Sequence, residues 1–223
     1  MTRRSRLVMV AAGVLALFAG APLLLRRASF FRVRQVEVVG AVFLTGGEVV
    51  RSLEVPPGAS LFDPLAGFAK RVTRLRGVRR AEIGRRWPGT LVVRIVEAQP
   101  VALTPNGGKL ALMDETATVL PFDPTRAPPD LPVAQRDSAV AEVLARVRET
   151  EPVLFAGLQA ARRVRGDVAL EADGRRYLLR ADATAAAIRA LASVARDLAR
   201  RGRSWDELDA RFADRVFVRG MTS

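Results

Sequence analysis

Near its start the chain carries an uncharged apolar run, Leu7–Leu25, which reads LVMVAAGVLALFAGAPLLL. A helix of these 19 residues would be about 28 Å long, close to the thickness of the hydrocarbon core of a bilayer. Arginines flank the run on both sides: Arg3, Arg4, Arg6, Arg26 and Arg27. The pattern predicts a transmembrane helix over residues 7–25, preceded by a cytoplasmic tail of residues 1–6.

Two other interpretations of this run remain open. Ala19-Gly20-Ala21 has the small-residue pattern of a signal-peptide cleavage site, and a helix buried in a protein core is also apolar. Pro22 would directly follow the cut and Leu23–Leu25 continues the run, which disfavours cleavage, and the flanking arginines disfavour a core helix. We therefore favour an uncleaved anchor. Its orientation does not follow from charge, because arginines on the two sides rival each other.

Residues 29–98 show the pattern of a small α+β domain. Phe31–Val39 is rich in β-branched residues and predicts a strand. Thr45 and Glu48 form a capping box ahead of apolar positions, which predicts a short helix. Asp63 followed by Pro64 predicts the start of a second helix, which we expect to end at Gly77.

Two further strands complete this first domain. Val78–Arg86 and Thr90–Glu97 are joined by the turn signal Trp87-Pro88-Gly89. In the second of them, alternate apolar residues share one face and Arg94 lies on the other. The order is β-α-α-β-β, which predicts two helices on one face of a three-stranded sheet.

Residues 99–220 predict a second, mixed domain rich in strands. Pro100 and Pro105–Gly108 mark the junction, and the proline-rich Pro121–Pro132 is a surface connection. The pattern then predicts a hairpin of Leu110–Met113 with Thr118–Leu120, followed by a helix that has Val140, Val143, Leu144 and Val147 on one face. Three strands follow, Ala161–Val164, Val168–Glu171 and Tyr177–Arg180, with a turn at Asp173-Gly174 between the last two. The last helix is Ala183–Arg201, capped by Asp182 and closed by Gly202.

The C-terminal segment predicts one long strand, Leu208–Val218, at the edge of a sheet. Leu208, Ala210 and Phe212 alternate with polar residues, and Val216–Val218 continues the pattern. An edge strand presents unpaired N–H and C=O groups, which either aggregate or receive a partner strand. We expect this edge to bind a partner by strand addition.

The composition of the chain excludes several classes of functional site. The chain has a net charge of +13 and contains neither cysteine nor histidine, which excludes histidine-based triads, cysteine nucleophiles, zinc sites and disulfides. We expect no metal, no cofactor and no enzymatic activity. A basic helix face of Arg189, Arg196 and Arg200 could contact nucleic acid or lipid, but a solvated face is the more common role. Glu97 and Asp114 are candidates for an acidic dyad, although a strand end and a turn explain them without catalysis.

Several stretches together resemble the FtsQ/DivIB family of bacterial cell-division proteins. They are FRVRQVEVVG, SLF, VRRAEIGRRWPGTLVVRIVEAQPVAL, the turn around Asp114, and the final WDELDARFADRVFVRG. Ala117 stands where that family usually has glycine, and Ala210 stands where it usually has leucine. Three alternatives remain. A POTRA protein of outer-membrane assembly or two-partner secretion would share the element order of the first domain. The other two are a basic nucleic-acid-binding membrane protein and an exported hydrolase.

The resemblance implies a fold and a role. The fold is α+β: a transmembrane helix, a β-α-α-β-β POTRA domain and an FtsQ-type β domain ending in an edge strand. The role is that of a non-enzymatic divisome scaffold in the inner membrane. The protein would cross the membrane once, with its N-terminus in the cytoplasm and most of the chain in the periplasm, and it would be located at midcell during division. It would recruit the FtsB–FtsL heterodimer and help control septal peptidoglycan synthesis. It would bind other divisome proteins through the POTRA domain and the transmembrane helix. We expect it to bind neither nucleic acid nor a small-molecule substrate.

The resemblance also implies a partner-binding site on the C-terminal strand, with Phe212 as the aromatic anchor. Arg163, ahead of an adjacent strand, is a possible salt-bridge donor to FtsB, a position that Arg162 could equally fill. The residues expected to bind the partner are Asp209, Arg211, Phe212, Arg215, Val216, Val218 and Arg163.

Overall fold

The computed structural model describes residues 29–126, 130–212 and 215–220. The chain divides into two compact units between Glu97 and Ala98. The transmembrane helix predicted over residues 7–25 lies outside the described residues. Within the described ranges, no helix is long and apolar enough to cross a membrane.

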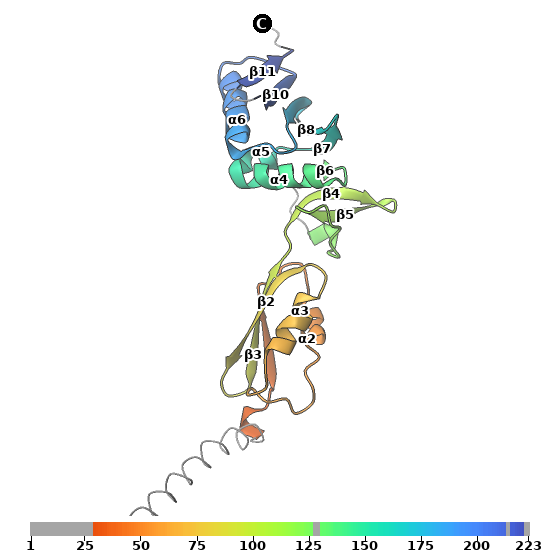
Figure 1. Ribbon diagram of the computed structural model, residues 1–223, viewed down its shortest axis with the longest axis vertical. Helices are drawn as coiled ribbons and strands as arrows, with labels where there is room; N and C mark the ends of the chain where they lie inside the picture. Colours follow the sequence, from red (N-terminus) through yellow and green to blue (C-terminus); the bar gives the residue numbers. More distant parts are fainter. Residues whose placement is uncertain (1–28, 127–129, 213–214, 221–223) are drawn as a thin grey trace, which may run out of the picture. The chain divides into compact units, whose positions relative to one another are not determined.

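Unit 1 has the predicted β-α-α-β-β order (Figure 1). Its elements are a 3-10 turn η1 (Ser29–Phe31), β1 (Gln35–Val39), α2 (Gly46–Leu53), α3 (Ala66–Thr73), β2 (Val78–Arg86) and β3 (Thr90–Glu97). The sheet order is β1-β3-β2, with β1 parallel to β3 and β2 antiparallel to it. The predicted bounds of β2 and β3 are confirmed.

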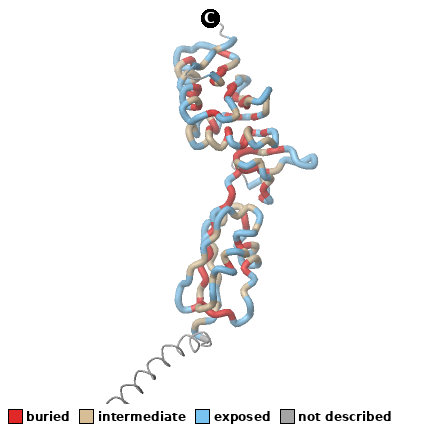
Figure 2. The backbone as a smooth tube through the Cα atoms, in the orientation of Figure 1, coloured by how far each residue is buried: buried red, intermediate tan, exposed pale blue. Residues whose placement is uncertain are grey.

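The core of unit 1 lies between its two helices and one face of the sheet. The capping box starts α2 as predicted, since Thr45 Oγ1 accepts from the Glu48 N–H at 3.2 Å and the Glu48 carboxylate accepts from the Thr45 N–H at 2.7 Å. Figure 2 shows buried stretches in both the helical and the sheet part of unit 1. The buried residues of the two helices and of β3 include Val49, Leu53, Phe68, Val72, Leu91, Val93 and Ile95. Burial of these side chains supplies the main stabilising free energy of the unit.

Three predicted element ends in unit 1 are wrong. The strand predicted over Phe31–Val39 begins only at Gln35, because residues before it pair with a loop: the Val33 N–H donates to the Ala59 carbonyl at 2.8 Å. The second helix begins at Ala66 and has no side-chain cap, because the Asp63 carboxylate accepts instead from the Ser60 N–H at 2.8 Å. That helix ends at Thr73, and Gly77 lies in the turn before β2.

Unit 2 is built on an eight-stranded sheet with the order β11-β10-β9-β8-β7-β6-β4-β5. Its strands are β4 (Pro100–Asn106), β5 (Lys109–Asp114), β6 (Val133–Ala134), β7 (Ala160–Val164), β8 (Asp167–Ala172), β9 (Arg175–Leu179), β10 (Glu207–Phe212) and β11 (Arg215–Arg219). Its helices are η2 (Pro124–Arg126), α4 (Ser138–Thr150), α5 (Pro152–Ala156) and α6 (Ala185–Arg200). Since α4 and α6 contact each other and both contact the sheet, they cover one face of it.

The predicted helix and strands in the middle of unit 2 are confirmed. All four residues of the predicted α4 stripe, Val140, Val143, Leu144 and Val147, are fully buried. The strands β7, β8 and β9 occur where the alternation predicts them, and the turn between β8 and β9 uses Asp173 and Gly174, both at positive φ. Helix α5 was not predicted, since its five residues are too short to show a helical period.

The start of unit 2 differs from the prediction. Residues Pro100–Asn106, interpreted as a junction, form β4, which makes a hairpin with β5 across Gly107 and Gly108. The predicted pairing of residues 110–113 with 118–120 is reduced to one bridge between Met113 and Val119. Asp114 explains this, because its carboxylate accepts from the N–H groups of Thr116 and Thr118 and holds the chain in a turn.

The last helix begins later than predicted. Its N-cap is Thr184, whose hydroxyl accepts from the Ala187 N–H at 3.3 Å. Asp182, the predicted cap, is bound instead by Arg180, with Nε to Oδ1 at 2.8 Å. Gly202 closes the helix as expected: it has a φ of +63°, and its N–H donates to the Ala199 carbonyl.

Candidate functional site

The C-terminal segment forms a hairpin, and this corrects the prediction of one edge strand over Leu208–Val218. The pattern is split between β10 and β11, which pair antiparallel with Leu208 opposite Val218. Strand β10 also pairs in parallel with β9, so β10 is interior and β11 is the edge of the sheet. The period-2 pattern was correct in each half, but it could not show that the chain reverses between them.

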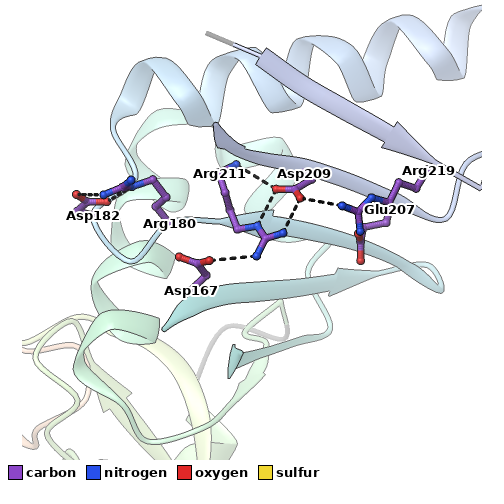
Figure 3. A network of polar contacts seen from close by, with 7 residues as sticks. All are labelled: Asp167, Arg180, Asp182, Glu207, Asp209, Arg211 and Arg219. Atoms are coloured by element: carbon purple, nitrogen blue, oxygen red, sulfur yellow. Dashed lines mark hydrogen bonds and ion pairs between the residues drawn. The ribbon is translucent and has the colours of Figure 1, made fainter. Parts of the chain in front are cut away.

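A network of charged side chains joins the last strands of the sheet (Figure 3). Arg211 Nε lies 2.8 Å from Asp209 Oδ1, and Arg211 Nη2 lies 2.7 Å from Asp209 Oδ2. The third guanidinium nitrogen of Arg211 donates to Asp167 on β8 at 3.2 Å. Arg219 on β11 lies 3.0 Å from Glu207 Oε1 and 3.5 Å from Asp209 Oδ2. The network therefore connects the edge strand β11 to β10, and β10 to β8.

The contacts of this network shift the pKa values of Asp209 and Arg211. Hydrogen bonds from Arg211, more than the neighbouring positive charges, hold the pKa of Asp209 below its ordinary value, although burial acts in the opposite direction. The same hydrogen bonds raise the pKa of Arg211. Asp209 is fully buried and ionised, which is tolerable only because its partners are cationic and hydrogen-bonded to it. Both residues thus contribute to the structure of the sheet.

Exposed aromatic side chains stand at the free edge. The rings of Phe212 and Phe217 meet edge-to-face with centroids 5.1 Å apart, and their exposed fractions are 51% and 44%. On β11, Arg215 is exposed, while Val216 and Val218 are half-buried. The Phe212–Phe217 pair therefore presents apolar surface beside β11, which is an edge strand of the sheet among the residues that the structure describes. Phe217 was not among the residues expected to bind a partner, because the predicted strand gave it no pairing with Phe212.

A groove of about 580 Å³ lies beside the same hairpin. One wall is the N-terminal part of α6, with the small side chains of Ala186, Ala187 and Ala190, and the other includes Phe212 and Val216. We call it the α6 groove. Its small side chains leave room for side chains of an added segment next to β11.

Arg163 lies away from this edge. It is on β7, and three strands separate β7 from β11, a distance of about 19 Å at the usual strand spacing. Its guanidinium lies 3.3 Å from Asp137 Oδ1, while Arg162 lies 3.2 Å from Glu171. The prediction that Arg163 precedes a strand adjacent to the last one is therefore wrong. A partner that contacts both places must extend across the sheet.

The two buried carboxylates considered for catalysis are each occupied by backbone N–H groups. Glu97 accepts from Val42, Phe43 and Leu44 at 3.1, 2.9 and 2.9 Å, and it belongs to unit 1. Asp114 belongs to unit 2 and accepts from its own turn. Among the residues that the structure describes, no group of three or more acidic side chains is placed to hold a metal ion.

Comparison with known proteins identifies the first unit. Residues 31–98 match the family model for the POTRA domain, FtsQ-type. Unit 1 is an FtsQ-type POTRA domain. The β-α-α-β-β order and the confirmed strand pair β2–β3 agree with this assignment. The resemblance to FtsQ/DivIB inferred from the sequence is thereby confirmed.

Cell-division proteins are similar to a larger part of the chain. It is 32% identical over 139 residues to the Cell division protein FtsQ of Streptomyces bingchenggensis (strain BCW-1), covering 60% of this chain and 51% of that protein. It is 33% identical over 144 residues to that of Streptomyces venezuelae, covering 64% and 53%. It is 36% identical over 154 residues to that of Rhodothermus marinus, covering 68% and 55%. The matched part of the chain thus spans about half the length of these FtsQ proteins.

Proposed function

We propose that this chain is a non-enzymatic scaffold of the bacterial divisome that recruits the FtsB–FtsL heterodimer through strand β11 and helps to control septal peptidoglycan synthesis. It sits in the inner membrane with its N-terminus in the cytoplasm and units 1 and 2 outside, and it gathers at midcell during division. The POTRA domain and the transmembrane helix meet other divisome proteins. Support for the family comes from the FtsQ-type POTRA domain and the FtsQ relatives.

The free edge of β11 is the observation that carries the partner assignment. An added strand would pair with its backbone, and main-chain hydrogen bonds of this kind give affinity while alternate side chains give specificity. The Phe212–Phe217 pair offers a central aromatic contact, the kind of residue that most often dominates binding energy. Arg215 is exposed and adds positive charge, which favours an acidic segment as the added strand.

Binding of the full chain to the FtsB–FtsL pair tests this proposal. We expect Phe212→Ala and Phe217→Ala each to weaken binding at least about 30-fold, as loss of roughly 2 kcal/mol at a hot spot implies. The matched control is Leu110→Ala, an apolar residue with an exposed fraction of 46% on β5, the opposite edge of the same sheet. We expect that variant to bind like the unaltered chain.

Truncation after Phe212, which removes β11 entirely, is the stronger variant. Strand β10 keeps its pairing with β9 in this truncation, so circular dichroism reports whether unit 2 is still folded. If the folded truncation binds FtsB–FtsL with unchanged affinity, β11 is not the site. A fluorescent fusion tests the wider assignment: midcell rings support it, and a uniform or nucleoid signal contradicts it.

A further inference from the structure

Four aromatic side chains gather at one end of unit 1. The ring of Phe31 is central, with centroids 5.1 Å from Phe30, 5.1 Å from Phe62 and 5.3 Å from Trp87. We call these four residues the aromatic cluster. Phe30 and Trp87 have exposed fractions of 60% and 53%, which is unusual for side chains of this size. Exposed apolar groups that lie together commonly mark a binding surface.

Two backbone hydrogen bonds hold the segments of this cluster together. The Leu61 N–H donates to the Phe31 carbonyl at 2.9 Å, which ties the loop before α3 to the segment before β1. The Arg34 N–H donates to the Gly89 carbonyl at 2.8 Å, which ties the same segment to the turn between β2 and β3. The exposed rings of Phe30 and Trp87 are therefore part of a built surface.

The cluster lies at the end of unit 1 where the chain enters it. Strands β1 and β3 are parallel, with Gln35 opposite Thr90, so their first residues share one end of the sheet. Phe30 follows Leu25, the last residue of the apolar run, by five residues. Five residues of chain reach at most about 18 Å. If residues 7–25 span a bilayer, the cluster is within reach of its headgroup layer, which is about 5–8 Å thick on each side.

Positive charge surrounds the cluster. Arg32 is exposed, and Arg34 donates to the Phe30 carbonyl at 3.2 Å, which is a neutral acceptor. Arg85 likewise donates to carbonyl groups, those of Leu61 and Asp63.

Two carboxylates lie nearby, and both are already engaged. Glu37 is ion-paired with Arg86, and the Asp63 carboxylate accepts from the Ser60 N–H. The excess of arginine complements an anionic lipid surface.

We propose that the aromatic cluster is a membrane-contact surface, which places Trp87 and Phe30 in the headgroup layer of an anionic bilayer beside the point where the chain leaves it. Trp and Phe side chains at a bilayer interface bury their apolar area while the flanking arginines meet lipid phosphates. The contact would fix the membrane-facing end of the POTRA domain against the bilayer. This proposal rests on the anchor predicted for Leu7–Leu25.

The two tryptophans of the chain make a direct test possible. Trp205→Phe leaves Trp87 as the one tryptophan, and Trp87→Phe leaves Trp205, which is buried in unit 2 against Tyr177. Each full-length variant is reconstituted in vesicles of phosphatidylcholine and phosphatidylglycerol that carry lipids brominated near the top of the acyl chain. We expect the emission of Trp87 to fall at least twofold and that of Trp205 to stay unchanged.

Two measurements separate folding and insertion from lipid contact. If Trp205→Phe does not fold, the difference between the unaltered chain and Trp87→Phe reports the same quenching. Resistance to alkaline extraction reports insertion. A chain that inserts while Trp87 is quenched no more than Trp205 overturns the membrane contact and leaves the anchor standing. A chain that does not insert overturns both.

The role of charge has its own matched pair of variants. Arg32→Gln should lower the quenching of Trp87 in anionic vesicles, whereas Arg94→Gln should not. Arg94 is exposed and lies opposite Val39, at the far end of the β1–β3 pairing from the cluster. Equal quenching in vesicles of phosphatidylcholine alone would overturn the preference for anionic lipid.

Discussion

Arg211 and Asp209, two residues apart on β10, are joined by two side-chain hydrogen bonds of 2.8 and 2.7 Å. Arg219 on β11 approaches the same buried carboxylate at 3.5 Å. The edge strand is thus connected to the sheet by side-chain charge as well as by backbone pairing. An added partner strand would therefore meet an edge that is already ordered, which lowers the entropy cost of binding.

Replacement of Asp209 by asparagine should destabilise unit 2 by about 1–3 kcal/mol, because the guanidinium of Arg211 loses a charged acceptor. Chemical unfolding of the full chain measures this change. The control is Asp182→Asn, which removes an aspartate from an exposed pair with Arg180 and should have little effect. Equal losses in the two variants would contradict a special role for the buried carboxylate.

The contribution of Asp209 should depend on pH. The pKa of Asp209 in the folded chain is lowered, while in the unfolded chain it has its ordinary value of about 3.9. A lowered folded pKa means that the ionised form stabilises the fold, fully above the unfolded pKa and progressively less as pH falls through the folded pKa. The stability difference between the unaltered chain and Asp209→Asn should be constant above about pH 5 and shrink below about pH 4. A difference that persists unchanged at low pH would contradict this.

Glu97 should be essential for the stability of the POTRA domain. Its carboxylate accepts three backbone N–H groups, from Val42, Phe43 and Leu44, in the loop before α2. In Glu97→Gln the amide nitrogen would face one of these donors, which we expect to cost about 2–3 kcal/mol in the free energy of unfolding. The control Glu82→Gln alters an exposed residue of β2 and should change stability by less than about 0.5 kcal/mol.

Ala117 offers a stabilising substitution. It has a φ of +62°, in the left-handed region that glycine adopts without steric cost. Ala117→Gly should therefore raise the stability of unit 2 by about 0.5–1 kcal/mol, measured as an increase in the melting temperature. Ala111→Gly, in the interior of β5, should lower it by a similar amount. A loss of stability in Ala117→Gly would contradict the assignment of strain to this turn.

Much of the fold could be predicted where the pattern was local. The capping box at Thr45, the turn at Trp87–Gly89 and the stripe of α4 each depend on residues within a few positions of one another. Errors arose where a side chain had two possible partners. Aspartate is a good helix cap, but the carboxylate of Asp63 accepts from the Ser60 N–H instead, and that of Asp182 accepts from the Arg180 guanidinium.

The candidate site was harder to predict, because it depends on pairing between segments. The alternation of Leu208 to Val218 fits one strand or two, and only the pairing of β10 with both β9 and β11 decides between them. The contact of Phe217 with Phe212 follows from that reversal. Arg163 shows the same limit, since strand order in the sheet cannot be obtained from spacing along the chain.

The parallel pairing of β1 with β3 also has a mechanical consequence. The chain enters unit 1 before Gln35 and leaves it after Glu97, at opposite ends of this strand pair. A pull between the two ends of the domain is directed along the strands and loads their hydrogen bonds in shear. All the bonds between β1 and β3 must then yield together, whereas a hairpin pulled from one end opens bond by bond. The β1–β3 pairing should therefore resist a pull along the chain more strongly than a hairpin pulled from one end would.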